Sequence, residues 1–354
     1  MSPSATRLRK LGVAVTMAFV LAVGLGTVDN PASHAGASTK TPTFRLAAMS
    51  PTSGATVDYR APLRLRFSAA VDLKGPLPTV SSTPGRWAQL SPNVLEYEPN
   101  APLALGQSVS VVFPTGRHGM ESTAHTRLAP TASLQFQTAP LSTLDAQEIL
   151  AELGYLPFSY SSASQAFTPR WSTLPAQLMS QWSPGQDNVL TKGAVMAFEN
   201  AHNMMTDGVV GPTVSNQLLA DASAHRTDPN PYNYVLVSQQ LPESLQLWLN
   251  GRVLMTEAVN TGIPGSTTNV GTFPVYLRYQ SQTMSGTNPD GSHYSDPGIP
   301  WVSYFSGGDA LHGFLRASYG SPQSLGCVEM PFNVAGQVWP NTPIGTLVTV
   351  EPEA

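Results

Sequence analysis

The stretch SLGCV at residues 324–328 decides how the C-terminal part of this chain is interpreted, because it holds the only cysteine among 354 residues. His312 and Gly313 stand shortly before that cysteine, Cys327. A single thiol has no internal disulfide partner, so it is either a buried apolar residue or a reactive group. The preceding Gly326 and a histidine on an adjoining strand suit a thiolate nucleophile with an imidazole base. The pattern favours a nucleophile over an inert thiol.

The composition is that of a β-rich extracellular protein. Charged residues make up 11% of the chain and hydrophobic residues 41%, with 32 prolines and 29 glycines. The length is sufficient for two or three domains, each with its own core. A formal net charge of −4 provides no basic surface for a phosphate backbone, so nucleic acid is excluded as a partner.

The N-terminus has the order of a targeting segment. Arg7, Arg9 and Lys10 precede an apolar stretch from 11 to 28, and small residues at 35–37 form a cleavage site. We therefore predict that residues 1–37 are a signal peptide, with an uncleaved membrane anchor as the alternative. The mature protein is expected to be secreted, in the cell wall or on the periplasmic side of the envelope.

Two segments with different periodicity follow. Residues 44–138 contain short runs of alternating apolar residues, such as Leu63, Leu65 and Phe67, which predict a small β-sandwich. Residues 142–223 have helical periodicity, with a Ser/Gln/Pro-rich insert over 157–187. The first expected helix has its N-cap at 142–143 and ends at Gly154.

From residue 233 to 352 the pattern predicts strands again. The run 244–249 alternates, an Asn-Gly turn follows at 250–251, and the chain returns as a second strand. We expect a polar loop over 280–296 and a closing strand over 345–350. The fold class is thus multidomain and mainly β: a sandwich, a small helical domain and a C-terminal β domain.

Short stretches of sequence in the three segments resemble known protein families. "LRLRFSAAV" and "LEYEPNAPLALG" resemble bacterial immunoglobulin-like domains, and "AQEILAELGYL" with "TDGVVGPTVSNQLL" resembles the three-helix peptidoglycan-binding domain. "LQLWLNGRVLMTEAVNTG", "VGTFPVY", "ALHG" and "QSLGCVEMP" resemble, in this order, the YkuD-type catalytic domain of L,D-transpeptidases. The combination of His-Gly with Ser-x-Gly-Cys is the specific part of the last resemblance.

This resemblance implies a transferase that builds peptidoglycan without a metal or another cofactor. Cys327 would attack the peptide bond after the third stem residue, and the acyl group would pass to an amine of a neighbouring stem, forming a 3→3 cross-link. His312 would be the base, with the Gly313 carbonyl orienting its ring. The N–H groups of Gly326 and Cys327 would hold the oxyanion. Substrate contacts would come from the side chains of Tyr294, Ser324 and Arg316. The implied partners are peptidoglycan stem peptides and glycan. The resemblance also implies that carbapenems inhibit the protein.

Two departures from the family pattern leave alternatives open. Leu325 stands where the family usually has His, and Glu329 stands where it usually has Arg. The first change removes a polar group beside the thiol, and the second replaces a cation with an anion. A non-catalytic peptidoglycan-binding scaffold with a decayed site is therefore one alternative. An L,D-carboxypeptidase of the same fold, in which water replaces the acceptor amine, is another.

Overall fold

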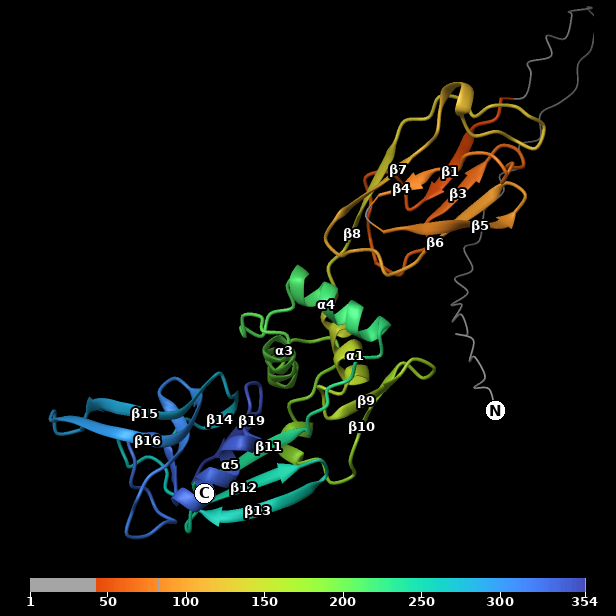
Figure 1. Ribbon diagram of the computed structural model, residues 1–354. Helices are drawn as coiled ribbons and strands as arrows, with labels where there is room; N and C mark the ends of the chain where they lie inside the picture. Colours follow the sequence, from red (N-terminus) through yellow and green to blue (C-terminus); the bar gives the residue numbers. More distant parts are fainter. Residues whose placement is uncertain (1–42, 82, 354) are drawn as a thin grey trace, which may run out of the picture. The chain divides into compact units, whose positions relative to one another are not determined.

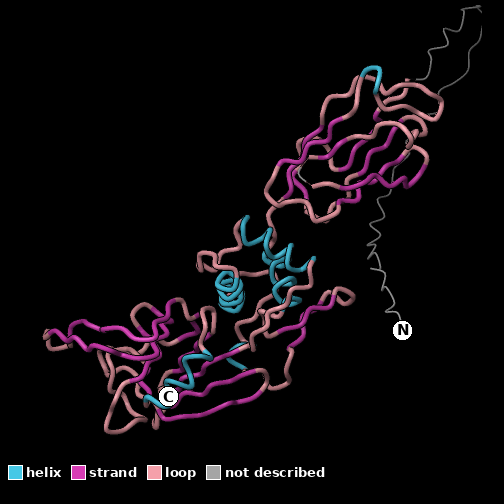
Figure 2. Tube along the Cα trace, viewed as in Figure 1, coloured by secondary structure: helices cyan, strands magenta, loops and turns pink. Residues whose placement is uncertain are grey.

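The computed structural model describes residues 43–81 and 83–353 (Figure 1). The predicted signal peptide, residues 1–37, lies outside the described residues. Among the described residues, no helix is long and apolar enough to cross a membrane. The predicted fold class is confirmed, since several sheets and few helices follow one another along the chain (Figure 2).

The first segment consists of two four-stranded sheets that share one core. Their orders are β1-β3-β6-β5 and β2-β8-β7-β4. The apolar residues of the alternating strand β3, Leu65 and Phe67, are buried, while Arg64 and Arg66 are exposed, as the period of two predicts. The immunoglobulin-like assignment of residues 44–138 stays a prediction. The elements are β1 (Leu46–Ser50), β2 (Thr56–Val57), β3 (Arg64–Phe67), β4 (Thr79–Val80), β5 (Gly85–Ser91), β6 (Val94–Pro99), β7 (Ser108–Val112), the 3-10 helix η1 (Gly116–His118) and β8 (Leu134–Thr138).

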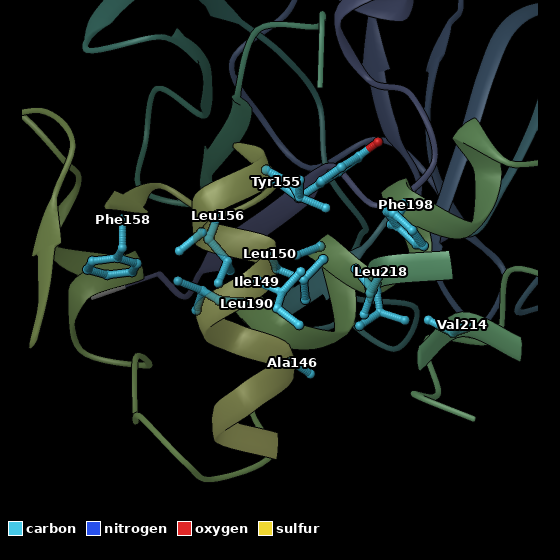
Figure 3. Close-up of a cluster of buried hydrophobic side chains, with 14 of the residues drawn as sticks. Ala146, Ile149, Leu150, Tyr155, Leu156, Phe158, Leu190, Phe198, Val214 and Leu218 are labelled. Atoms are coloured by element: carbon cyan, nitrogen blue, oxygen red, sulfur yellow. The ribbon is translucent and has the colours of Figure 1, made fainter. Parts of the chain in front are cut away.

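The second segment contains three longer helices around an apolar cluster (Figure 3). Ser142 begins α1 by accepting a hydrogen bond from the N–H of Asp145, and Gly154 ends it in a left-handed conformation. The predicted insert holds a β-hairpin and a short helix. The peptidoglycan-binding assignment of residues 142–223 stays a prediction. The elements are α1 (Thr143–Leu153), β9 (Phe158–Ser161), β10 (Ala166–Pro169), α2 (Ala176–Met179), α3 (Val189–Ala201) and α4 (Pro212–Ser223).

The third segment contains two sheets with a common core. One sheet has the order β13-β12-β11-β19-β14, and the other has the order β15-β16-β17-β18. Both contribute to one cluster of buried apolar residues, against which α5 also packs. The elements are β11 (Asn233–Ser238), β12 (Ser244–Leu249), β13 (Arg252–Ala258), β14 (Gly271–Pro274), β15 (Leu277–Thr287), β16 (His293–Ser306), β17 (Asp309–Gly313), β18 (Val328–Met330), α5 (Phe332–Val338), the 3-10 helix η2 (Trp339–Asn341) and β19 (Leu347–Glu351).

The expectation of a polar loop over 280–296 was wrong. These residues belong to a long antiparallel hairpin, in which β15 pairs with β16 from Leu277↔Tyr304 to Thr287↔His293. Figure 1 shows the two strands side by side along their length. The outer part of the hairpin does not pack against the apolar core of the domain. Its side chains are therefore mostly polar on both faces, and the sequence lacks the alternation of apolar and polar residues that indicates a strand. Backbone pairing and a Pro-Asp-Gly turn at 289–291 are sufficient to form it.

Candidate active site

The alternation of two parallel strands brings the predicted nucleophile and base to one face of a sheet. In the β17–β18 ladder, His312 pairs with Glu329 and Leu311 pairs with Val328. Because paired residues share a face and neighbours alternate, His312 and Glu329 point one way and Leu311 and Val328 the other. Leu311 and Val328 enter the apolar core of the domain. Cys327 lies just before β18, and it lines the same cleft as His312.

A cleft of about 810 Å³ covers this face. Its floor is formed by residues of β17, of β18 and of the turn before β18, and one wall is formed by the β15–β16 hairpin. All of the predicted site side chains line it: Tyr294, His312, Arg316, Ser324 and Cys327. The structure therefore brings together side chains that the sequence placed up to 33 residues apart.

The imidazole of His312 is held by the backbone next to it. The residue is 3% exposed, and its Nδ1 lies 3.1 Å from the carbonyl oxygen of Gly313. A carbonyl only accepts, so Nδ1 carries the proton and the lone pair of Nε2 remains available. Burial lowers the pKa of His312, and the Gly313 carbonyl offsets part of this effect. The imidazole is thus neutral near pH 7 and suited to accept a proton.

The thiol of Cys327 is kept in its protonated form. Cys327 packs against a small apolar cluster of Ile299, Val302 and Ala310. Burial raises the pKa of the thiol to about 12; the backbone N–H of Ala310 lowers it in part, and the carboxylate of Asp309 raises it further. The thiolate nucleophile expected from the sequence is therefore not the resting state, because burial penalises the charged form of the thiol.

A serine hydroxyl braces the turn that presents the thiol. Ser324 is 2% exposed; its Oγ donates to the carbonyl oxygen of Cys327 at 2.5 Å and accepts from the N–H of Gly326 at 3.2 Å. Gly326 has a φ of 114°, and a Cβ there would lie 2.5 Å from a carboxylate oxygen of Asp309. Only glycine therefore fits this turn without strain. The N–H of Gly326 is occupied by Ser324, whereas the N–H of Cys327 has no hydrogen-bond partner among the described residues.

Arg316 is paired with the residue that departs from the family pattern. Its Nε and Nη2 donate to the two carboxylate oxygens of Glu329 at 2.7 and 2.8 Å, and Nη2 also reaches the carbonyl oxygen of Gln323. Glu329 is 4% exposed, so this bidentate partner neutralises a carboxylate that would otherwise be buried without compensation. Nothing in the spacing of Arg316 and Glu329 along the sequence predicts this ion pair.

The hairpin wall contributes two tyrosines to the cleft, and only one of them was predicted from the sequence as a site residue. Tyr294 was predicted from the resemblance, and Tyr304 was missed because it lies within a run that looks like an ordinary strand. Both line the cleft. Burial, and secondly the charge of Cys327, raises the pKa of each phenol.

No metal-binding arrangement is seen in the part of the chain that the structure describes: no group of three or more His, Cys, Asp or Glu side chains is placed to hold an ion. The polar groups of the cleft are those of a cysteine–histidine site with one ion pair. Such a set can perform acyl transfer, in which the thiol is the nucleophile and the imidazole moves the proton.

Comparisons with known proteins show what the chain is similar to. Residues 232–350 match the model of the YkuD family, the L,D-transpeptidase catalytic domain. Among solved structures, an L,D-transpeptidase from Mycobacterium smegmatis is 14% identical over 88% of this chain and 100% of its own, with a TM-score of 0.30. L,D-transpeptidase 3 from Mycobacterium tuberculosis, in complex with a faropenem-derived adduct, is 13% identical over 87% and 98%, with a TM-score of 0.32.

The catalytic domain of the E. faecium L,D-transpeptidase is 24% identical over 35% of this chain and 100% of its own, with a TM-score of 0.31. These structural likenesses are too weak to carry an argument by themselves. No curated protein matches the chain. The family model confirms the resemblance predicted from the sequence, so residues 232–350 carry the L,D-transpeptidase catalytic domain of the YkuD type.

Proposed function

We propose that the protein is a peptidoglycan L,D-transpeptidase that forms 3→3 cross-links through an acyl-enzyme on Cys327. The observation that carries this proposal is that Cys327, just before β18, and His312, on β17, line the floor of the same large cleft. The match of residues 232–350 to the family model supports the same reaction class. The chemistry needs no cofactor, because nucleophile and base are both side chains of the chain.

The first half-reaction transfers the donor stem to the enzyme. As the sulfur of Cys327 bonds to the carbonyl carbon after the third stem residue, Nε2 of His312 takes the thiol proton. The tetrahedral oxyanion is held by the free N–H of Cys327. The C–N bond then breaks, and the imidazolium returns the proton to the leaving amine of the terminal D-Ala.

The second half-reaction passes the acyl group to an amine of a neighbouring stem. His312 takes a proton from this amine as its nitrogen bonds to the thioester carbon. The C–S bond breaks, and the imidazolium protonates the sulfur, so the neutral pair is restored. Because both groups rest in their neutral forms, the proton moves during each attack and not before it.

The surroundings of Tyr294, Arg316 and Ser324 indicate how each of these predicted substrate-binding residues would act. Tyr294, partly exposed on the hairpin, lines the donor-peptide site. Arg316, whose Nη1 has no hydrogen-bond partner among the described residues, contacts substrate with that edge while Glu329 holds the rest of the guanidinium. Ser324 acts on substrate only through the turn that it braces.

The same site is expected to react with carbapenems. The E. faecium catalytic domain has been solved acylated by ertapenem, and the M. tuberculosis enzyme with a faropenem-derived adduct. A carbapenem presents a strained carbonyl to the same thiol, so we propose that it acylates Cys327.

We further propose that the protein works outside the cytoplasm, at the cell wall. The support is the predicted signal peptide at 1–37 and the resemblance of residues 142–223 to peptidoglycan-binding domains. Secretion would place the catalytic domain where its substrate is, and the helical segment would hold it on the glycan.

One observation favours a second candidate function, a non-catalytic peptidoglycan-binding protein. The pKa of Cys327 is raised to about 12, and Leu325 supplies no polar group that would lower it. A thiol in that state is a slow nucleophile unless the substrate and His312 assist it.

Product analysis separates the candidates. The protein would be incubated with a disaccharide-tetrapeptide donor, with and without an amine acceptor, and the products identified by mass spectrometry. A cross-linked dimer that appears only with acceptor is the expected result. Tripeptide without dimer would indicate an L,D-carboxypeptidase. Unchanged donor together with retention on intact sacculi would contradict the transpeptidase and leave the binding protein.

A further inference from the structure

The oxyanion site on the floor has fewer free donors than the sequence suggested. Of the two predicted N–H groups, that of Gly326 already donates to Ser324 Oγ. The N–H of Cys327 remains, and one backbone donor is less than acyl-transfer sites commonly provide. A second donor is therefore to be sought on the wall that faces the thiol.

Tyr304 has the right position in the sheet. It pairs with Ala310 across the β16–β17 ladder, so its side chain points to the face that carries His312. The backbone N–H of the same Ala310 interacts with the sulfur of Cys327. Tyr304 and Cys327 also pack against the same apolar cluster. The phenol thus stands over the residue whose backbone contacts the nucleophile.

The hydroxyl of Tyr304 is held with its proton free to donate. Nε2 of Gln282, on the neighbouring strand β15, donates to the phenol oxygen at 2.5 Å. An amide NH₂ only donates, so Tyr304 must be the acceptor in this bond. No acceptor for its own O–H lies within hydrogen-bond distance among the described residues, so that proton is available to an incoming group.

We propose that Tyr304, fixed by Gln282, is a catalytic residue whose hydroxyl donates to the carbonyl oxygen of the donor as it becomes an oxyanion. This inference rests on the proposed acyl transfer. Tyr304 would complete the site with the N–H of Cys327: one donor from the floor and one from the wall. Gln282 is then a positioning residue, because it acts only through the phenol.

Tyr294 is the rival donor, since it also lines the cleft. Its hydroxyl has no hydrogen-bond partner among the described residues, and its ring lies across Gly286, where an added Cβ would be 2.8 Å from both the ring and the hydroxyl. A phenol without a fixed partner is poorly preorganised, and preorganisation is the source of oxyanion stabilisation. The observations therefore favour Tyr304.

The test compares a reaction that develops an oxyanion with one that does not. Acylation of Cys327 by a carbapenem or by the tetrapeptide donor passes through an oxyanion, whereas alkylation by iodoacetamide requires only the thiolate. Both rates would be measured by intact-protein mass spectrometry on the full mature chain and on its Tyr304→Phe, Tyr294→Phe and Gln282→Leu variants. Tyr279→Phe, which removes an exposed phenol outside the cleft, is the matched control.

We expect Tyr304→Phe to reduce the acylation rate by about 100-fold or more, as the loss of one oxyanion donor does elsewhere. Its alkylation rate should equal that of the unmodified protein, and its melting temperature should confirm that it folds. Gln282→Leu should give a smaller loss of acylation alone, and Tyr279→Phe should change neither rate.

Four results would overturn the assignment. Equal acylation rates for the unmodified protein and Tyr304→Phe would remove Tyr304 from the site. An equal fall in the acylation and alkylation rates would show that the phenol promotes formation of the thiolate and does not bind the oxyanion. Loss in Tyr294→Phe with none in Tyr304→Phe would identify the other tyrosine. Absence of any adduct on the unmodified protein would overturn the proposed function itself, and this assignment with it.

Discussion

The floor and the wall of the cleft are built in opposite ways. On the floor, His312 and Glu329 lie between core residues such as Leu311 and Val328, and all four are nearly inaccessible to solvent. The wall is the hairpin β15–β16, whose outer part alternates between exposed and partly exposed residues. Packing therefore fixes the position of the reacting groups, whereas mainly backbone pairing holds the outer part of the hairpin.

This difference separates chemistry from specificity. A change on the floor disturbs a close-packed core and the proton transfer together. A change on the outer part of the wall, away from Tyr304, leaves the core intact and alters only what the substrate meets. Variants of the floor should therefore change rate and stability, whereas variants of the outer hairpin should change apparent affinity.

The largest effect should come from the base on the floor. His312→Ala removes the only imidazole that lines the cleft, so we expect acylation to fall by about 10²- to 10⁴-fold. His293→Ala is the matched control, since His293 is exposed on the β15–β16 hairpin and outside the cleft. Single-turnover acylation by a carbapenem provides the rates. Similar losses in both variants would mean that His312 has no special role.

Stability should separate the two regions next. Leu311 is 1% exposed in the core behind the floor, so Leu311→Ala should reduce the free energy of unfolding by about 2–5 kcal/mol. Met284 is partly exposed on the wall, so Met284→Ala should reduce the free energy of unfolding by about 1 kcal/mol or less. Denaturant unfolding monitored by fluorescence measures both, and equal losses would refute the contrast.

The pH dependence of thiol reactivity tests the electrostatics of the floor. Because the pKa of Cys327 is raised to about 12 by burial, the thiolate fraction is small at neutral pH and grows with pH. The rate of alkylation by iodoacetamide should rise about tenfold per pH unit between pH 7 and 9. Asp309→Asn removes a carboxylate that raises this pKa, so it should react faster at pH 8. A rate that levels off near pH 7 would instead indicate an activated thiolate.

The smallest effect is expected on the wall. In Gly286→Ala the new Cβ would lie 2.8 Å from the ring of Tyr294, so the ring must move away from its place over the strand. We expect the apparent KM for the donor to rise a few-fold, with little change in the acylation rate at saturation. Ser281→Ala, exposed on the same strand and outside the cleft, is the control. A change in rate at saturation with an unchanged KM would contradict the division.

The same contrast explains what the sequence could predict. Cys327, His312 and the strands around them were predictable, because buried strands carry strong apolar patterns and the two motifs occur in order. The prediction of a loop over residues 280–296 was wrong, because a two-stranded hairpin that does not pack on the core can form without alternating apolar residues. The pairing of Arg316 with Glu329 and the bond from Gln282 to Tyr304 were not predictable, since each joins residues whose spacing carries no signal.

The central claim is that Cys327 receives the acyl group of the donor on the floor of the cleft. Intact-protein mass spectrometry of the mature chain, mixed with the tetrapeptide donor and compared with Cys327→Ala, tests it most directly. We expect an adduct with the mass of the donor less its terminal D-Ala, present on the unmodified protein and absent from the variant. An adduct that persists in Cys327→Ala, or no adduct on either protein while the donor is consumed, would contradict it.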